Sequence, residues 1–171
     1  MLDEIPVRPL TRKDFKPFGD IIEVDNEVEG ISINDGFATR YNDLASVDVN
    51  EFGGRPLINI FRCRPRPVPI RIHMMERHPL ASQAFIPLHK IPFLIVVALP
   101  GEMVGPESLF AFVTNGRQGV NYARGVWHFP LIGLREEQDF LVVDRGGDGN
   151  NCDEFYFNES ETRIIKRSLS S

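Results

Sequence analysis

The feature that most limits how this chain can fold is the even spread of its glycines and prolines. The 171 residues include 14 Gly and 13 Pro, which occur along the whole chain. Because both residue types interrupt helices, few segments keep the roughly twelve residues of an average helix. Short strands joined by tight turns are the expected result. The pattern therefore predicts an all-β fold with a few short helices.

The same spacing favours one architecture among the β folds. Strands do not alternate with long helices, which argues against a doubly wound sheet or a barrel of parallel strands. An antiparallel barrel, closed or sandwiched, pairs nearly every strand edge and leaves an interior that can hold one small ligand. We therefore expect an antiparallel β-barrel that forms one domain over residues 1–171.

Local patterns place the individual elements. A helix is expected at residues 11–18, with Thr11 as its cap and Asp14 as the acid of a capping box. Residues 69–75 alternate in character, and one face of this strand would carry Ile70, Ile72 and Met74. Further strands are expected at residues 20–24, 57–61, 93–99, 109–113 and 140–143.

Two of these segments have consequences beyond their own structure. Residues 93–99 are apolar throughout, so both faces of that strand should be buried. Residues 154–171 lose their periodicity and should form a terminal arm with a frayed end.

Composition limits the partners and the location of the chain. Lys and Arg number 19 against 24 Asp and Glu, so the formal charge is −5 and nucleic acid is not an expected partner. We expect no signal segment and no membrane span, because the longest apolar run is far shorter than the roughly 20 residues that a membrane helix needs. The two cysteines, Cys63 and Cys152, suit a reducing cytoplasm.

The densest group of polar residues begins in the 69–75 strand. It contains His73, Glu76, His78 and, after a proline-containing turn, Gln83. Glu76 and His78 are two residues apart, so on a strand they share a face. With Gln83, they could point into the mouth of a barrel. The alternative is an exposed strand end whose polar side chains merely face water.

A second group surrounds His128. Gly125 permits a tight turn three residues earlier, and Trp127 precedes the histidine directly. A histidine in this position could be a hydrogen-bonded core residue. However, His78 and His128 occupy matching turn-to-strand positions 50 residues apart in the sequence, which favours a shared site.

Arginines near the ends of strands are candidate anion-binding residues. Arg40, which precedes Tyr41, and Arg124 lie in such positions. The guanidinium group is suited to bidentate capture of a carboxylate. The alternative for each is an ordinary surface ion pair.

The two polar groups resemble the motifs of the cupin superfamily. The first cupin motif has two histidines two residues apart and an acid five residues later, and Glu76, His78 and Gln83 keep that spacing with two replacements. Gly125 and His128 keep both positions of the second motif, in which a glycine precedes a histidine by three residues. The resemblance implies a cupin-like barrel and a metal site formed by His78, Gln83 and His128.

A closer resemblance extends over residues 10–153. Residues 76–87, with the sequence ERHPLASQAFIP, are similar to the signature of the ureidoglycolate lyase family. Further similar segments occur in the family's order at residues 40–45, 114–122, 126–128, 139–141, 144–147 and 151–153.

This resemblance implies a carbon–nitrogen lyase of the amidine-lyase class. Its members cleave (S)-ureidoglycolate to glyoxylate and urea in allantoin breakdown, a part of purine metabolism. The resemblance also implies a cytoplasmic homodimer and Ni²⁺ or another divalent metal, without an organic cofactor. A dimer is expected as well from the apolar strand at residues 93–99, because dimers commonly bury such a surface.

The implied reaction needs a base that removes a hydroxyl proton and an acid that protonates the leaving nitrogen. We expect His78 and His128 to fill these roles near neutral pH, with Glu76 orienting one imidazole or acting as the base. Arg40 or Arg124 would bind the substrate carboxylate. Further substrate contacts are expected from Tyr41, His73 and Gln83. A bound metal could instead polarise the hydroxyl and the carboxylate, and the sequence leaves both routes open.

Two other functions suit the same fold. One is a different metal-dependent cupin enzyme, an isomerase or an oxygenase. The other is a non-catalytic barrel that binds a small acid. Such a sensor usually carries a fused DNA-binding unit, and this chain has neither spare length nor a basic stretch for one.

Overall fold

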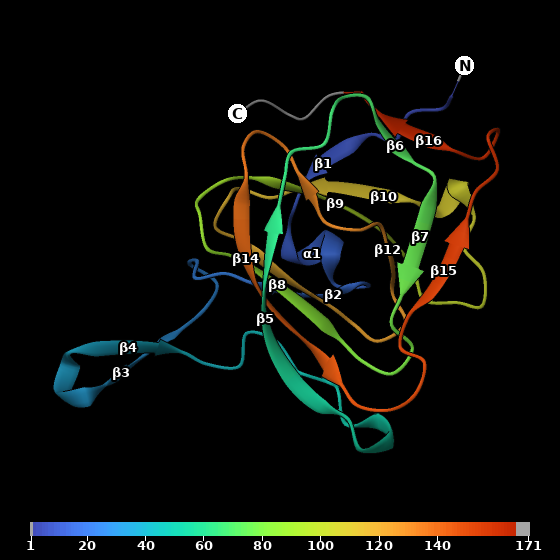
Figure 1. Cartoon of the computed structure of the whole chain (residues 1–171). Helices are drawn as coiled ribbons and strands as arrows, with labels where there is room; N and C mark the ends of the chain where they lie inside the picture. The colour runs from blue at the N-terminus through green and yellow to red at the C-terminus, as the bar shows by residue number, and fades with distance from the viewer. Residues whose placement is uncertain (1, 167–171) are drawn as a thin grey trace.

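Two β-sheets form most of the chain in the computed structural model, which describes residues 2–166 (Figure 1). The larger sheet has seven strands in the order β1-β10-β9-β12-β7-β15, with β13 paired to β9. Its strands are β1 (Val7–Pro9), β7 (Met74–Arg77), β9 (Phe93–Ala98), β10 (Phe110–Val113), β12 (Trp127–His128), β13 (Ile132–Gly133) and β15 (Asp153–Tyr156). The smaller sheet has five strands in the order β2-β11-β8-β14-β5. They are β2 (Gly19–Ile22), β5 (Arg55–Cys63), β8 (Gln83–Pro87), β11 (Gly119–Tyr122) and β14 (Gln138–Gly146).

Two ribbons of two strands and four short helices complete the described part of the chain. The ribbons pair β3 (Gly30–Ile33) with β4 (Ala38–Tyr41), and β6 (Ile70–Ile72) with β16 (Arg163–Ile165). The helices are α1 (Arg12–Phe15), η1 (Asn34–Gly36), η2 (Glu51–Gly53) and η3 (Pro106–Ser108). The prediction of a mainly β fold with a few short helices is confirmed. Within residues 2–166, however, no strand pairing closes a sheet into a barrel.

Strand β9 lies at the centre of the molecule, because both of its faces are buried in apolar cores. One face packs between the two sheets and carries Phe93, Ile95 and Val97. The other face packs in a second core and carries Leu94, Val96 and Ala98. The prediction of a strand buried on both faces is therefore confirmed. Since the chain itself covers both faces, the expectation of a dimer through this strand loses its basis.

The capped helix α1 contributes to the core that lies between the two sheets. Thr11 accepts a hydrogen bond at its Oγ1 atom from the backbone N–H of Asp14, at 3.2 Å, which confirms the predicted cap. The helix ends at Phe15 and not at residue 18, because Pro17 has no backbone N–H with which to continue the helical hydrogen bonds. Phe15 is fully buried and anchors the helix between the sheets.

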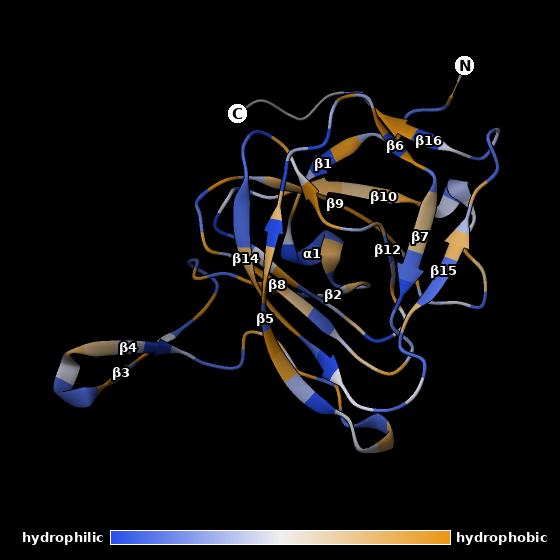
Figure 2. Cartoon of the chain, in the orientation of Figure 1, coloured by the Kyte–Doolittle hydropathy of each residue, from blue (hydrophilic) through white to orange (hydrophobic). Residues whose placement is uncertain are grey.

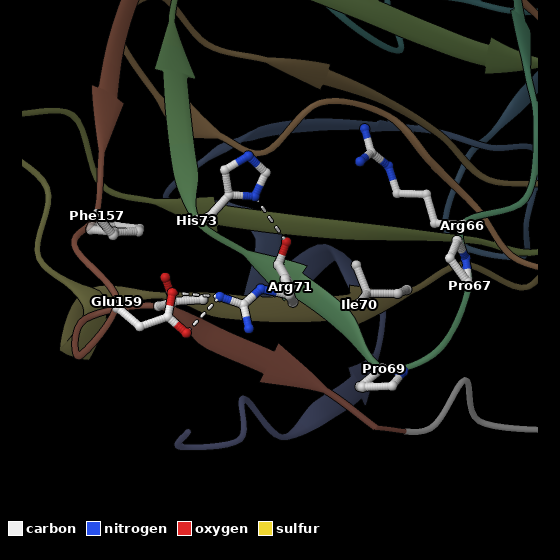
Figure 3. A pocket seen from close by; sticks show the side chains of 9 residues that line it. Arg66, Pro67, Pro69, Ile70, Arg71, His73, Phe157 and Glu159 are labelled. Carbon is white, nitrogen blue, oxygen red and sulfur yellow. Dashed lines mark hydrogen bonds and ion pairs between the residues drawn. The ribbon is translucent and has the colours of Figure 1, made fainter. Parts of the chain in front are cut away.

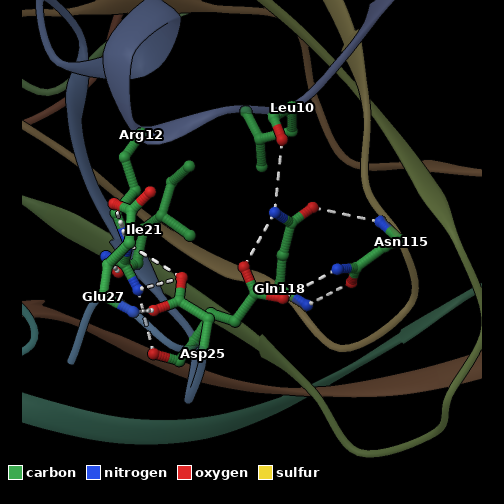
Figure 4. Close-up of polar contacts among 8 residues, drawn as sticks. Leu10, Arg12, Ile21, Asp25, Glu27, Asn115 and Gln118 are labelled. Carbon is green, nitrogen blue, oxygen red and sulfur yellow. Dashed lines mark hydrogen bonds and ion pairs between the residues drawn. The ribbon is translucent and has the colours of Figure 1, made fainter. Parts of the chain in front are cut away.

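Polar contacts hold the segments on either side of this helix (Figure 4). The side-chain amide of Gln118 donates to the backbone oxygen of Leu10 at 3.2 Å and to the carboxylate of Glu23 at 2.9 Å. Arg12 donates to the backbone oxygen of Ile21 and to the carboxylate of Asp25, each at 3.0 Å. The N-terminal segment is thereby fixed to the edge of the smaller sheet at β2.

The strand expected at residues 69–75 consists of two strands. β6 ends at Ile72 and pairs with β16, whereas β7 begins at Met74 and pairs with β12 and β15. His73 lies between them, where the chain changes partners. The predicted alternation therefore fails at Met75, which is buried in the same core as Met74.

The end of the chain also differs from the expectation of a terminal arm. Strand β15 pairs with β7, and β16 pairs with β6, so much of the segment predicted as an arm belongs to the sheets. The irregular pattern arises because each strand is short and the two pair in different sheets. The frayed end predicted after residue 166 lies outside the described residues. Among those that are described, no helix is long and apolar enough to cross a membrane.

Candidate active site

Strand pairing brings the two polar groups of the sequence together. Strands β7 and β12 are antiparallel neighbours, and Glu76 lies directly opposite His128. The Nε2 atom of His128 is 3.4 Å from Oε1 of Glu76. His128 is only 2% exposed, so this pair is shielded from water on the histidine side.

His78 extends this pair into a cluster. Its ring centroid lies 5.1 Å from that of His128. The Nε2 atom of His78 is 3.1 Å from Oε1 of Gln83, at the start of β8 in the smaller sheet. The backbone N–H of Gly125 donates to the backbone oxygen of His78 at 3.0 Å and ties the two turns together. The predicted group of Glu76, His78, Gln83 and His128 is thus one site at a junction of the two sheets.

A tyrosine that sequence patterns did not single out as a site residue holds one of these rings. Tyr122 stacks on His128 with ring centroids 4.4 Å apart and an angle of 16° between the planes. Burial raises the pKa of Tyr122, and the charge of Glu76 raises it further, so the phenol stays protonated. The stack therefore fixes the plane of the His128 ring without adding a charge.

Burial and neighbouring charges set the protonation of the site. Burial alone would raise the pKa of Glu76, but the hydrogen bond with His128 and the charges of both histidines outweigh it, and the net pKa is lowered. Glu76 is therefore a carboxylate at neutral pH. Burial lowers the pKa of His78, and the charge of His128 lowers it further. His78 is therefore neutral at pH 7 and can accept a proton.

The donor atoms also fit a metal ion. One ligand atom each from Glu76, His78 and His128 lies within 4.8 Å of the others. The Nδ1 atoms of His78 and His128 face the backbone oxygens of Asn151, at 2.6 Å, and of Val126, at 3.1 Å. Metal-binding histidines are commonly oriented in this way, with the second nitrogen directed at the metal. The Nε2 atom of His128 is buried, and its one polar contact within residues 2–166 is the carboxylate of Glu76 at 3.4 Å, so it is open to a ligand on that side.

A cavity of about 470 Å³ opens beside this cluster. Glu76 and Gln83 line one part of it, and three arginines line another: Arg62, Arg64 and Arg66. Arg62 pairs with Asp139 at 2.8 Å and Arg64 with Glu137 at 3.3 Å. Arg66 pairs with no carboxylate in the described part of the chain, and its guanidinium lies 4.9 Å from the ring centre of Phe129. This arginine is available to an anion in the cavity.

The other predicted substrate contacts are not part of the lining of this cavity. Arg124 pairs with Asp48 at 2.6 Å and with Glu51 at 3.1 Å. Arg40 and Tyr41 belong to β4, in a hairpin that projects from the sheets (Figure 1). His73 lines a separate cavity of about 550 Å³, together with Arg66 and Arg71 (Figure 3). In the described structure, therefore, these residues do not line the cavity beside Glu76.

Sequence patterns missed several neighbours of the cluster. Arg66 follows β5 in a proline-rich turn, and no motif distinguishes it from the arginines around it. Cys152 and Glu154 each place a ligand atom within 4.8 Å of Glu76. They approach it because β15 pairs with β7 and sets Glu154 opposite Glu76. That pairing could not be foreseen once this segment was predicted to be an irregular arm.

The fold and the site define a class: a mainly β protein with a partly buried histidine–carboxylate cluster beside a cavity of about 470 Å³. A family model described as "Ureidoglycolate lyase" matches residues 2–164. Ureidoglycolate lyase from Pseudomonas syringae pv. syringae (strain B728a) is 51% identical over 159 residues, 93% of each chain. The Burkholderia mallei (strain NCTC 10229) protein of that name is 53% identical over 156 residues, 91% of each chain. The Azotobacter vinelandii protein is 47% identical over 163 residues, 95% of this chain and 98% of its own. The chain belongs to the ureidoglycolate lyase family.

Proposed function

We propose that the cluster cleaves ureidoglycolate to glyoxylate and urea. The observation that carries the proposal is the meeting of Glu76, His78 and His128 beside a cavity that also contains Arg66. The substrate is a small anion with a hydroxyl group, a carboxylate and a ureido nitrogen on one carbon. The cavity of about 470 Å³ has room for it, and its lining offers groups for each of these parts.

The reaction divides into two proton movements around one bond cleavage. A base removes the hydroxyl proton, the oxygen electron pair forms the carbonyl of glyoxylate, and the carbon–nitrogen bond breaks. The departing nitrogen then takes a proton and becomes urea. His78, neutral at pH 7 because of its lowered pKa, is the proposed base. His128 is the proposed proton donor, with its ring held by Tyr122 and by Glu76.

We assign the substrate carboxylate to Arg66. Arg124 already contacts two carboxylates, and Arg40 lies on the projecting hairpin. The guanidinium of Arg66 is free of carboxylate partners within residues 2–166 and lines the same cavity as Glu76. The amide of Gln83, in that lining as well, is placed to bind the ureido group. The roles predicted for Arg40, Tyr41 and His73 stay predictions.

A divalent metal, Ni²⁺ or another transition metal, is the alternative route at the same residues, because a histidine nitrogen that binds a metal does not also transfer a proton. Glu76, His78 and His128 would hold it, and the side-chain oxygen of Gln83, 3.1 Å from Nε2 of His78, is a further donor. A bound metal would supply Lewis-acid polarisation of the substrate oxygens. Calorimetric titration of the metal-free protein with NiCl₂ tests the assignment. We expect one site per chain in the wild type and loss of that site in His128→Ala, whereas equal binding by both proteins would contradict it.

The lyase activity is tested by incubating the purified protein with racemic ureidoglycolate. We expect glyoxylate and urea to form in equal amounts, up to half of the racemate if one enantiomer is used. Tight binding without turnover would instead favour a non-catalytic barrel. Bound iron with uptake of oxygen would favour an oxygenase.

We further propose that the chain acts as a homodimer in the cytoplasm. Cys63 and Cys152 are both free thiols, which suits a reducing compartment. Sedimentation at micromolar concentration tests the dimer, and a mass of one chain, 19.4 kDa, would contradict it.

A further inference from the structure

The hairpin of β3 and β4 has no sheet to pack on in its own chain. Within residues 2–166, the two strands pair only with each other, and the hairpin projects from the two sheets (Figure 1). A two-stranded hairpin is marginally stable in water unless a third strand or another surface covers it. Near its tip, Phe37 is 94% exposed, and Ile31 on β3 is exposed as well. The hairpin therefore has an apolar surface that another surface should cover.

A surface of matching character lies on β5, at the edge of the smaller sheet. β5 is nine residues long and pairs with β14 on one side only, so its other edge is free among the described strands. Phe61 contacts Phe85 on the inner side, and alternation turns Ile58 and Ile60 to the outer side. These two isoleucines are 76% and 56% exposed, and Figure 2 shows the apolar stretch on β5. Long exposed edge strands of this kind are usually covered.

The residues around β5 enlarge this apolar surface. Leu141 and Val143 of β14 lie opposite Ile60 and Ile58 in the sheet, on the same outer face. Phe52, in the helix η2 just before β5, is 76% exposed. Its backbone φ is +48°, a conformation that is strained for a bulky residue. An exposed aromatic ring held in this conformation suggests a contact surface.

The segments that carry the two surfaces also differ in charge, although the hairpin strands and their turn (residues 30–41) themselves hold one acid and one arginine. Residues 25–43 contain five acidic residues and one arginine, a formal charge of −4, whereas residues 55–66 contain four arginines and no acid, a formal charge of +4. Some of these charges are neutralised within the chain. Arg12 pairs with Asp25 and Glu27. Arg62 pairs with Glu137 and Asp139, and Arg64 pairs with Glu137. In the described structure, Asp35 near the hairpin tip and Arg55 at the start of β5 have no such partner. The remaining charges therefore favour contact between the two surfaces.

We propose that the β3–β4 hairpin is a dimerisation arm that docks on the outer face and free edge of β5 in a second copy of this chain. Each copy carries one arm and one acceptor surface, so a twofold axis satisfies both contacts at once and closes the dimer. Phe37 would insert among Phe52, Ile58 and Ile60 of the other copy. This inference rests on the proposed homodimer and specifies the surfaces that form it.

The mass of the protein in solution tests the arm, independently of any enzymatic activity. We expect the wild type at micromolar concentration to sediment with twice the mass of one 19.4 kDa chain. Phe37→Asp and Ile60→Asp should each sediment as a single chain. Both positions are exposed in the single chain, so the variants should keep the wild-type circular dichroism spectrum. Met103→Asp, at a residue that is 74% exposed and outside both surfaces, is the control and should remain a dimer.

A photo-reactive residue at position 37 identifies the acceptor directly. In a mixture of isotopically light and heavy chains, we expect cross-links between chains that join position 37 to residues 52–62. A wild-type monomer would overturn both the homodimer and the arm. A dimer that survives both aspartate substitutions, or links elsewhere, would overturn the arm and leave the homodimer intact.

Discussion

His78 is the residue whose protonation the surrounding structure controls most directly. Its two ring nitrogens face oxygen atoms, of Asn151 at 2.6 Å and of Gln83 at 3.1 Å, and both contacts favour the protonated ring. Burial and the charge of His128 act in the opposite direction and prevail, so the pKa is lowered. The balance keeps a neutral imidazole next to the carboxylate of Glu76 at neutral pH.

Titration of His78 by nuclear magnetic resonance in the metal-free protein should therefore give a pKa below the ordinary value of 6.5. Since the unfolded chain binds this proton more tightly than the folded chain, His78 lowers stability at acidic pH. Its effect on the free energy of unfolding is absent above pH 6.5 and grows as the pH falls from 6.5 through the lowered pKa. A titration midpoint at or above 6.5 would show that the ring is not buried as described.

Arg66 offers a second test at single-residue scale. Loss of a charge-assisted hydrogen bond to the substrate carboxylate should cost about 1.5–3 kcal/mol, so Arg66→Ala should lower kcat/KM by about 10- to 150-fold. Arg64→Ala removes an arginine of the same cavity that is paired with Glu137, and should have little effect. If Arg66→Ala keeps full kcat/KM while Arg40→Ala or Arg124→Ala loses it, the assignment from sequence alone was the better one.

At the scale of strands, sequence patterns predicted the features that depend on neighbouring residues in the chain. The uninterrupted apolar run at residues 93–99 correctly indicated a strand with two buried faces, but the strand ends at Ala98 and Leu99 is 53% exposed. The same reasoning failed at His73, where the chain leaves β16 and joins β12 and β15. A change of partner depends on strands far away in the sequence, and no local pattern reports it.

Local spacing in the sequence also predicted part of the candidate site, whereas the residues brought in by distant strand pairing could not be predicted. The two-residue spacing of Glu76 and His78 placed both on one face of a strand. The glycine turn before His128 marked a position that matches that of His78. In the structure, these three residues lie in one cluster. Tyr122 and Glu154 join it only through the pairing of β11 with β8 and of β15 with β7. Arg124 suits anion binding in the sequence, but its partners Asp48 and Glu51 are visible only in the fold.

The central position of β9 predicts where the fold is most sensitive. Ile95→Ala leaves a cavity between the two sheets, and substitutions of this kind typically lower the free energy of unfolding by about 2–5 kcal/mol. Leu88→Ala, at a side chain that is 53% exposed, should change it by less than about 0.5 kcal/mol. Urea denaturation of both variants checks the contrast. Equal effects would mean that β9 does not form the centre of the core.

At the scale of the whole molecule, the two sheets supply different parts of one site. The larger sheet carries Glu76 and His128, while the smaller sheet supplies Gln83 and the wall of the cavity at Phe61 and Phe85. A histidine and a carboxylate can thus be buried together while the cavity stays open on one side. The chain belongs to the ureidoglycolate lyase family, and the proposed function makes ureidoglycolate the substrate of this arrangement.

The most direct test of the account is the rate at which glyoxylate and urea form from ureidoglycolate in wild type, His78→Ala and His128→Ala. Removal of a proton-transferring or metal-binding histidine should lower kcat by at least about 100-fold in each single variant. The double variant should be little worse than the poorer single one, because the two residues act as one unit. His89→Ala, at an exposed residue in a turn, should stay near wild type. Folded single variants that keep wild-type turnover would contradict the account and place the chemistry elsewhere in the molecule.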